Sequence, residues 1–121
     1  MNPILLVVMG GALGSLGRFG VGLLCAKLFG ADYPWGTLSV NIIGGFAMGM
    51  VFAYFADNRP MTLLLATGVL GGFTTFSAFS LETVRMIERG AIPLALGYVA
   101  ASVVFACMAV WAGLSVGRAL Q

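Results

Sequence analysis

Four long apolar stretches joined by short polar turns constrain the fold of this chain more than any other feature of its sequence. They run from about Pro3 to Ala26, Trp35 to Phe55, Met61 to Arg89 and Ile92 to Gly117. Each has about twenty residues or more, which is enough to cross a bilayer as a helix. Only 8% of the 121 residues are charged, whereas a soluble domain carries about 25%. We therefore predict a single all-α membrane domain over residues 1–121, with four transmembrane helices.

The composition argues against several classes of function. The net charge of +2 is too small to indicate a nucleic-acid partner, and the chain has no histidine to shuttle protons or bind a transition metal. Cys25 and Cys107 lie in apolar stretches without a CxxC partner, so we expect two buried free thiols. The first stretch has no basic segment before it, so it predicts a membrane span rather than a cleaved signal peptide. These features favour a multi-pass membrane protein that is not an enzyme.

The third apolar stretch is too long for one straight span. At 1.5 Å per residue, about 28 helical residues measure roughly 42 Å, against about 30 Å of hydrocarbon. The run from Gly71 to Ser80 favours a break, because adjacent glycines and adjacent threonines are poor helix formers. Backbone that leaves the helix within lipid must be buried in protein or line a hydrated cavity. We therefore predict a broken third helix between Gly71 and Thr75, with Phe76 and Phe79 on one face beside an ion site.

Polar side chains inside the predicted spans are functional candidates, because they are costly in lipid. Arg18 in the first span either snorkels toward the interface near Lys27 or makes a vestibule electropositive. Asn41 in the second span either forms an interhelical hydrogen bond or donates its amide N–H groups to an anion. Tyr98 and Ser102 lie one turn apart in the fourth span and offer hydroxyl donors, although Tyr98 also suits interfacial anchoring.

No acidic residue is expected at mid-membrane depth. Asp32 and Asp57 fall in turns, Glu88 falls near the emerging end of the third stretch, and Glu82 follows the predicted break. A cation pathway or a proton-coupled transporter normally needs a buried carboxylate. The available donors are amides, hydroxyls, an arginine and the positive edges of phenyl rings. The pattern favours an anion pathway, although phenylalanine in a membrane helix more often simply packs.

The charge pattern gives little guidance on orientation. With both termini on one side of the membrane, that side carries Arg59 and Arg118, and the opposite side carries Lys27, Arg85 and Arg89. So small a difference is a weak positive-inside signal. We infer that the chain inserts in both orientations and pairs as an antiparallel dimer; a single orientation set by another factor is the alternative. Glycines spaced four apart in every stretch predict close helix packing and also favour an oligomer.

Three segments make the chain resemble the Fluc (CrcB) family of fluoride channels over essentially its whole length. They are Gly10 to Arg18 in the first stretch, Gly36 to Gly44 in the second and Gly71 to Phe79 in the third. The third segment is highly specific, and a chance match to all three in order is improbable. The resemblance implies an antiparallel, dual-topology homodimer in the bacterial plasma (inner) membrane, with two pores at the subunit interface.

The resemblance also implies roles for individual residues. It assigns the fluoride pathway to Asn41, Thr75, Phe76, Ser77, Phe79, Tyr98 and Ser102. Phe76 and Phe79 would present their ring edges to the ion, and Arg18 would lie in the vestibule. Ala106, one turn beyond Ser102, would make the polar track on the fourth span shorter.

The same resemblance implies one bound cation and a passive mechanism. A structural sodium ion would lie at the dimer interface, held by the backbone carbonyls of Gly71 and Thr74. Fluoride would leave the cytoplasm down the membrane potential, which supplies about 2.3 kcal/mol per charge per 100 mV. The expected partners are fluoride, sodium, the lipid bilayer and a second copy of the chain, and the expected consequence is fluoride resistance.

Two other functions remain open from the sequence. A small multidrug-type proton-coupled transporter has a similar size and helix count, but it needs a glutamate in its first helix, where this chain has only Arg18 as a charge. A non-transporting membrane assembly subunit would explain the spaced glycines but would leave the run from Gly71 to Ser80 without a role.

Overall fold

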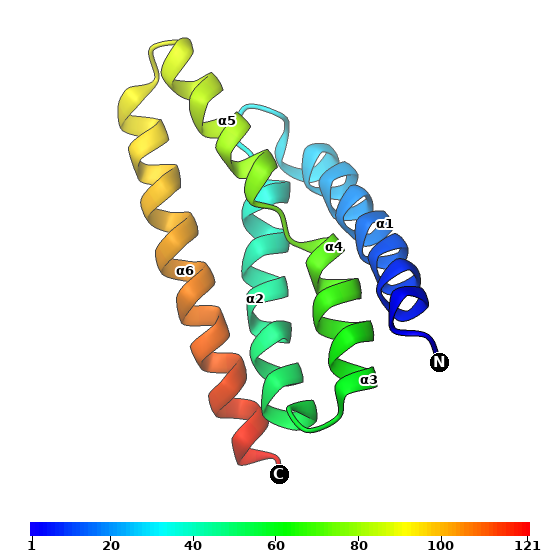
Figure 1. Cartoon of the computed structure of the whole chain (residues 1–121). Helices are drawn as coiled ribbons and strands as arrows, with labels where there is room; N and C mark the ends of the chain where they lie inside the picture. Colours follow the sequence, from blue (N-terminus) through cyan, green and yellow to red (C-terminus); the bar gives the residue numbers. More distant parts are fainter.

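The computed structural model describes all of residues 1–121 and is all-helical, with no strands. Its helices are α1 (Pro3–Phe29), α2 (Trp35–Phe55), α3 (Arg59–Thr62), η1 (Leu63–Leu70), α4 (Gly71–Phe73), α5 (Phe76–Glu88) and α6 (Ile92–Ala119). Because α3 to α5 form one traverse from Arg59 to Glu88, four segments are long and apolar enough to cross a membrane. Figure 1 shows these segments running alternately up and down, with both chain termini toward the same end. The predicted four spans are confirmed.

Local sequence signals explain where the helices begin and where the chain turns. Asn2 accepts a hydrogen bond from the Ile4 N–H at 2.8 Å, and Pro3 suits the first helical turn of α1. Gly30 and Gly90 each have a φ of 81°, a left-handed conformation that glycine adopts without steric cost. They lie at the turns that follow α1 and α5, so both turns reverse the chain direction within a few residues.

Glycines allow α2 and α6 to pack backbone against backbone. Gly45 and Gly49 on α2 face α6, and a methyl group at Gly45 would lie 2.9 Å from the Ala106 carbonyl oxygen. Gly113 on α6 faces α2 in return, where a methyl group would collide with the Phe46 carbonyl oxygen. The packing role predicted for the spaced glycines is therefore confirmed in these two helices.

A second set of glycines joins α1 to η1 and α4. A methyl group at Gly68 would lie 2.9 Å from the Gly10 Cα, and one at Gly72 would lie 2.6 Å from the Gly11 carbonyl oxygen. Gly14 is buried in the same contact of α1 with η1 and α4. Since α1 also contacts α2, the four spans form one bundle in which the close contacts are made by residues without side chains.

Few large side chains are buried within the bundle. Seven of the ten buried apolar residues form two small clusters, one of Phe79, Met86, Ala95 and Tyr98 and one of Val51, Ala66 and Leu70. Large apolar side chains instead cover the outside, among them Leu16, which is 68% exposed, and Trp111, which is 70% exposed. A helix that is apolar all round belongs in a core or in lipid, so this exterior suits a bilayer.

The backbone leaves helical geometry only briefly between α4 and α5. Thr74 (φ −86°, ψ 159°) and Thr75 (φ −153°, ψ 123°) are extended, and α5 begins at Phe76. The sequence predicts an interruption from Gly71 onward, but Gly71 and Gly72 are still helical, and Gly72 is part of the tight contact with α1. Before them, η1 is wound as a π-helix, a form that often accompanies functional sites.

Candidate functional site

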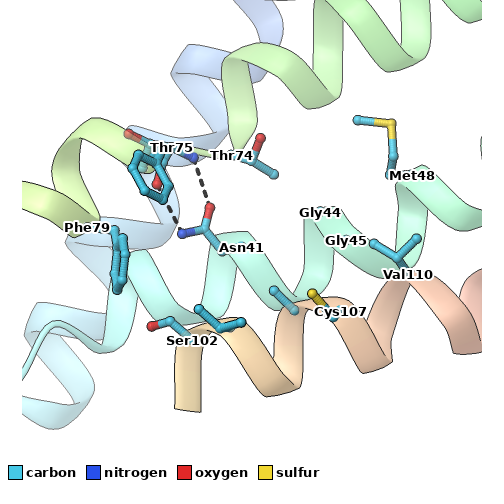
Figure 2. A pocket seen from close by; sticks show the side chains of 13 residues that line it. Asn41, Gly44, Gly45, Met48, Thr74, Thr75, Phe79, Ser102, Cys107 and Val110 are labelled. Atoms are coloured by element: carbon cyan, nitrogen blue, oxygen red, sulfur yellow. Dashed lines mark hydrogen bonds between the residues drawn. The ribbon is translucent and has the colours of Figure 1, made fainter. Parts of the chain in front are cut away.

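Asn41 on α2 supports the extended backbone between α4 and α5. Its side-chain carbonyl accepts a hydrogen bond from the Thr75 N–H at 2.8 Å, and its amide nitrogen donates to the Thr75 carbonyl at 3.1 Å. Figure 2 shows this two-point contact. Extended backbone in a membrane protein needs such partners, because it has lost those of the helix. The interhelical hydrogen bond considered for Asn41 is therefore present, and one amide N–H remains free to donate elsewhere.

The two threonine hydroxyls stabilise the same turn. The Thr74 hydroxyl donates to the Leu70 carbonyl at 2.9 Å, closing the end of the preceding helix. The Thr75 hydroxyl accepts from the Ala78 N–H at 3.2 Å, which caps the N-terminus of α5, and it lies 3.3 Å from the Ser77 hydroxyl. The threonines that disfavour a continuous helix thus build the local structure that replaces it.

A cavity of about 390 Å³ lies between α2, the α4–α5 junction, α5 and α6. Six of the residues predicted for the ion pathway or its cation site line it: Asn41, Thr74, Thr75, Phe76, Phe79 and Ser102. The Ser102 side chain is only 7% exposed, and its hydroxyl has no hydrogen-bond partner within the chain. A buried polar group without a partner is costly, so this hydroxyl is the clearest sign that the cavity takes a polar or charged occupant.

The two phenylalanines lie side by side at the cavity. Their ring centroids are 5.4 Å apart and their planes are tilted by 56°. Phe79 is 8% exposed, whereas Phe76 is 77% exposed. The pair therefore extends from the interior of the bundle to its surface. The prediction that Phe76 and Phe79 lie on one face of the helix is confirmed.

Two predicted pathway residues lie outside the cavity lining. Ser77 is exposed and contacts the Thr75 hydroxyl. Tyr98 is fully buried, and its ring packs on Phe79 with centroids 5.3 Å apart. The Tyr98 hydroxyl donates to Glu82 at 2.9 Å, so in this structure it bonds a carboxylate and does not anchor at an interface.

Glu82, which follows the extended turn, has a central place in the site that the sequence does not predict. One carboxylate oxygen accepts from Tyr98, and the other accepts from the Thr37 hydroxyl at 2.8 Å. The half-buried Glu82 thus joins α5 to α2 and α6. The available signal was its spacing, because Glu82 follows Phe79 by three residues and Thr37 precedes Asn41 by four, so both share faces with site residues.

Arg18 points into the bundle. Its Nε donates to the Gly72 carbonyl at 3.1 Å, so the guanidinium contacts α4 in the middle of the third traverse and does not snorkel to the interface. It lines a second cavity of about 410 Å³ together with Ser15, Thr37 and Thr75. Arg18 is the only charged residue in the lining of this cavity, and the Thr37 hydroxyl there also donates to Glu82. Thr75 lines both cavities, so the extended turn forms part of the wall of each.

The cysteines differ from each other. Cys25 is buried and free, as predicted, with its sulfur 3.9 Å from the Ser39 hydroxyl. The predicted burial of Cys107 is wrong, because it is exposed on the face of α6 that lines the first cavity. Apolar sequence context could not distinguish a side chain packed in the bundle from one on its open face.

No group of histidine, cysteine, aspartate or glutamate side chains could hold a metal ion. The predicted sodium ligands are instead the backbone carbonyls of Gly71 and Thr74. Gly71 is exposed, and Thr74 is half-buried at the start of the extended turn.

Comparison with known proteins identifies similar chains along nearly the full length. A family model described as "CrcB-like protein, Camphor Resistance (CrcB)" matches residues 5–114. A protein of Paracoccus denitrificans named "Fluoride-specific ion channel FluC" is 54% identical over 121 residues, covering 98% of this chain and 97% of the relative. Proteins of the same name from Agrobacterium fabrum and Allorhizobium ampelinum are 50% and 49% identical, with 99% and 98% of both chains covered, respectively.

Proposed function

This chain belongs to the CrcB-like protein family, and on that premise we propose that it is a passive, fluoride-selective ion channel. It resides as a multi-pass protein in a bacterial membrane and lets cytoplasmic fluoride leave the cell, which gives fluoride resistance. Its relatives at 49% to 54% identity are named fluoride-specific ion channels over nearly the same length. The protein is a transporter of ions and not an enzyme.

One feature of the site supports this proposal most directly: a single cavity brings two free hydrogen-bond donors together with two phenyl rings. The unpartnered Ser102 hydroxyl and the free N–H of Asn41 are donors, and Phe76 and Phe79 contribute ring edges with partial positive charge. Fluoride is small and strongly hydrated, so a pore must replace its water with closely placed donors. The larger chloride ion fits such spacing less well, which supplies selectivity.

The second cavity supports a vestibule for the same pathway. Arg18 attracts anions there, because it is the only charged residue in the lining of this cavity. Thr75 borders both cavities, so fluoride passes from the vestibule side to the phenyl rings at this residue. Tyr98 and Ser77 belong to the pathway as flanking residues, Tyr98 by holding Phe79 and Ser77 by contacting Thr75.

The complete channel is an antiparallel, dual-topology homodimer with two pores at the subunit interface. The first cavity supports this assembly, because Phe76 and Cys107, which line it, are exposed and leave its outer side open for a second copy of the chain. The weak charge difference between the two ends of the bundle is compatible with insertion in either direction.

A structural sodium ion joins the two copies at their centre, held by the Gly71 and Thr74 carbonyls. Oxygen atoms are the ligands that hard cations take, and interrupted membrane helices commonly supply them from backbone carbonyls. Gly71 is exposed and Thr74 has left helical geometry, so both positions suit this role.

A liposome efflux measurement tests the proposal directly. Purified protein is reconstituted in vesicles loaded with fluoride or with chloride, and a potassium ionophore provides the counter-current. We expect rapid fluoride release and little chloride release. Chloride release as fast as fluoride release would contradict the proposal.

The small multidrug-type alternative is less favoured. No acidic residue lies in α1, so the proton-binding glutamate that such a transporter needs is absent, and Arg18 occupies the interior of that helix. Protein-dependent uptake of an organic cation driven by a proton gradient would support this alternative instead.

A further inference from the structure

Five aromatic rings in successive contact form a continuous row from the α1–α2 connection to the first cavity. Trp35 contacts Tyr33 with centroids 4.7 Å apart, and Tyr33 meets Tyr98 at 5.5 Å with an interplanar angle of 81°. Tyr98 contacts Phe79 at 5.3 Å, and Phe79 contacts Phe76 at 5.4 Å. One end of this row therefore lies at the start of α2, beside the α1–α2 connection, and the other end consists of the phenyl rings at the proposed pathway.

Tyr33 connects Trp35 to Tyr98 in this row of rings, although it lies outside every helix. It belongs to the connection 30–34, is half-buried, and packs on the cluster that contains Phe79 and Tyr98. Its hydroxyl makes no hydrogen bond within the chain, and burial raises the pKa of Tyr33 above its usual value. The contribution of Tyr33 is therefore made by its neutral ring.

The geometry at Tyr98 explains why this ring matters. Tyr98 is fully buried, bonded through its hydroxyl to Glu82, and in contact with Phe79 on one side and with Tyr33 on another. Edge-to-face contacts favour a defined ring orientation. Without the Tyr33 ring, Tyr98 would gain room to turn, and the orientation of Phe79 and the bond to Glu82 would no longer be fixed.

We propose that Tyr33 is a positioning residue for the fluoride pathway, acting through Tyr98 to fix the orientation of Phe79. The inference rests on the proposed channel function and deepens it, because it adds a residue of the α1–α2 connection to the residues that determine conduction. Tyr33 need not contact the ion.

The first experiment separates the ring from the hydroxyl. Tyr33→Leu removes the ring, Tyr33→Phe keeps it, and Phe29→Leu is the matched control because the Phe29 ring contacts Trp35 and not Tyr98. We expect fluoride efflux from vesicles to fall about two- to tenfold in Tyr33→Leu, the range for one lost ring contact, and to stay at the wild-type rate in the other two variants.

A second experiment tests whether the effect passes through Tyr98. If it does, Tyr33→Leu combined with Tyr98→Leu loses no more efflux than Tyr98→Leu alone, since coupled residues are not additive. Size-exclusion profiles and helical content are measured for every variant. Should Tyr33→Leu not fold, Tyr33→Met, which keeps an apolar side chain of similar length, takes its place in both experiments.

The outcomes distinguish this inference from the proposed function. Wild-type vesicles that release no fluoride would overturn both. Wild-type release together with undiminished release by folded Tyr33→Leu would overturn the positioning role alone. The positioning role would also be overturned if fluoride efflux through Tyr33→Phe were as slow as through Tyr33→Leu. It would likewise be overturned if the efflux losses of Tyr33→Leu and Tyr98→Leu multiplied in the double variant.

Discussion

Asn41 replaces, with one side chain, the two backbone partners that Thr75 loses when the helix is interrupted. The amide accepts from the Thr75 N–H and donates to its carbonyl, and both bonds lie within the bundle. Deleting the amide would leave a partly buried donor and a partly buried acceptor without partners, each of which carries a desolvation penalty. The residue is thus needed for structure even where its remaining N–H serves an ion.

We expect Asn41→Ala to destabilise the protein by about 2 kcal/mol, the cost of leaving buried backbone groups unpaired. The measurement is the thermal unfolding midpoint in detergent. Ser39→Ala on the same helix is the control, because its hydroxyl has only a weak contact with Cys25 at 3.9 Å. Equal midpoints for the two variants would show that the Thr75 bonds contribute little.

Phe76 gives a prediction about conduction alone. Phe76→Ile keeps an apolar side chain but removes the ring edge, so we expect fluoride efflux to fall about tenfold or more while the protein still folds and assembles. Phe105→Ile is the matched control, because Phe105 is half-exposed on α6 and lies outside both cavities. Undiminished efflux in Phe76→Ile would show that the ring edges are dispensable.

At the scale of the helices, the seam between α2 and α6 depends on the absence of side chains. Gly113 sits against the Phe46 carbonyl, and the space there does not admit a methyl group. Gly97, on the same helix, has no atom within 4 Å of the position its methyl group would take. The two glycines therefore differ in packing while sharing helical backbone.

We expect Gly113→Ala to separate α2 from α6 and lower both the yield of folded protein and its unfolding midpoint. Gly97→Ala should be neutral or stabilising by up to about 1 kcal/mol, because alanine is the better helix former. Detergent-solubilised yield and thermal unfolding measure both. A Gly113→Ala protein as stable as Gly97→Ala would mean that the seam tolerates a methyl group.

The helices and the candidate site were predictable to different degrees. Apolar length predicted the four spans, and the Phe76 and Phe79 face followed from helical spacing. The partners of Arg18 and Asn41 could not be predicted, because they lie 54 and 34 residues away and depend on how the helices are set against each other. Glu82 was not assigned a role for the same reason: its bonds reach α2 and α6, which periodicity along α5 does not reveal.

For the whole molecule, the distribution of charge decides how it enters the membrane. Both termini lie toward the same end, and neither end has a strong excess of positive charge. A few added lysines should therefore fix the orientation. The exposed turn residues Ala56 and Asp57 lie at the terminal end, and Ala31 and Asp32 lie at the other.

We expect Ala56→Lys/Asp57→Lys and Ala31→Lys/Asp32→Lys to orient the chain in opposite directions. If the channel is an antiparallel dimer, each variant alone should fail to protect fluoride-exposed cells, and coexpression of the two should restore resistance. Membrane levels of each protein are measured in parallel. Full resistance from either fully oriented variant alone would contradict the antiparallel assembly.

The Asn41–Thr75 contact also has a consequence for biogenesis. The chain is made from its N-terminus, so α2 reaches the membrane 34 residues before the extended turn that Asn41 supports. Asn41, which supplies the hydrogen bonds to the non-helical segment, is therefore synthesised before that segment. With the reverse chain order, the turn would enter lipid before Asn41 and its polar backbone groups would lack these partners.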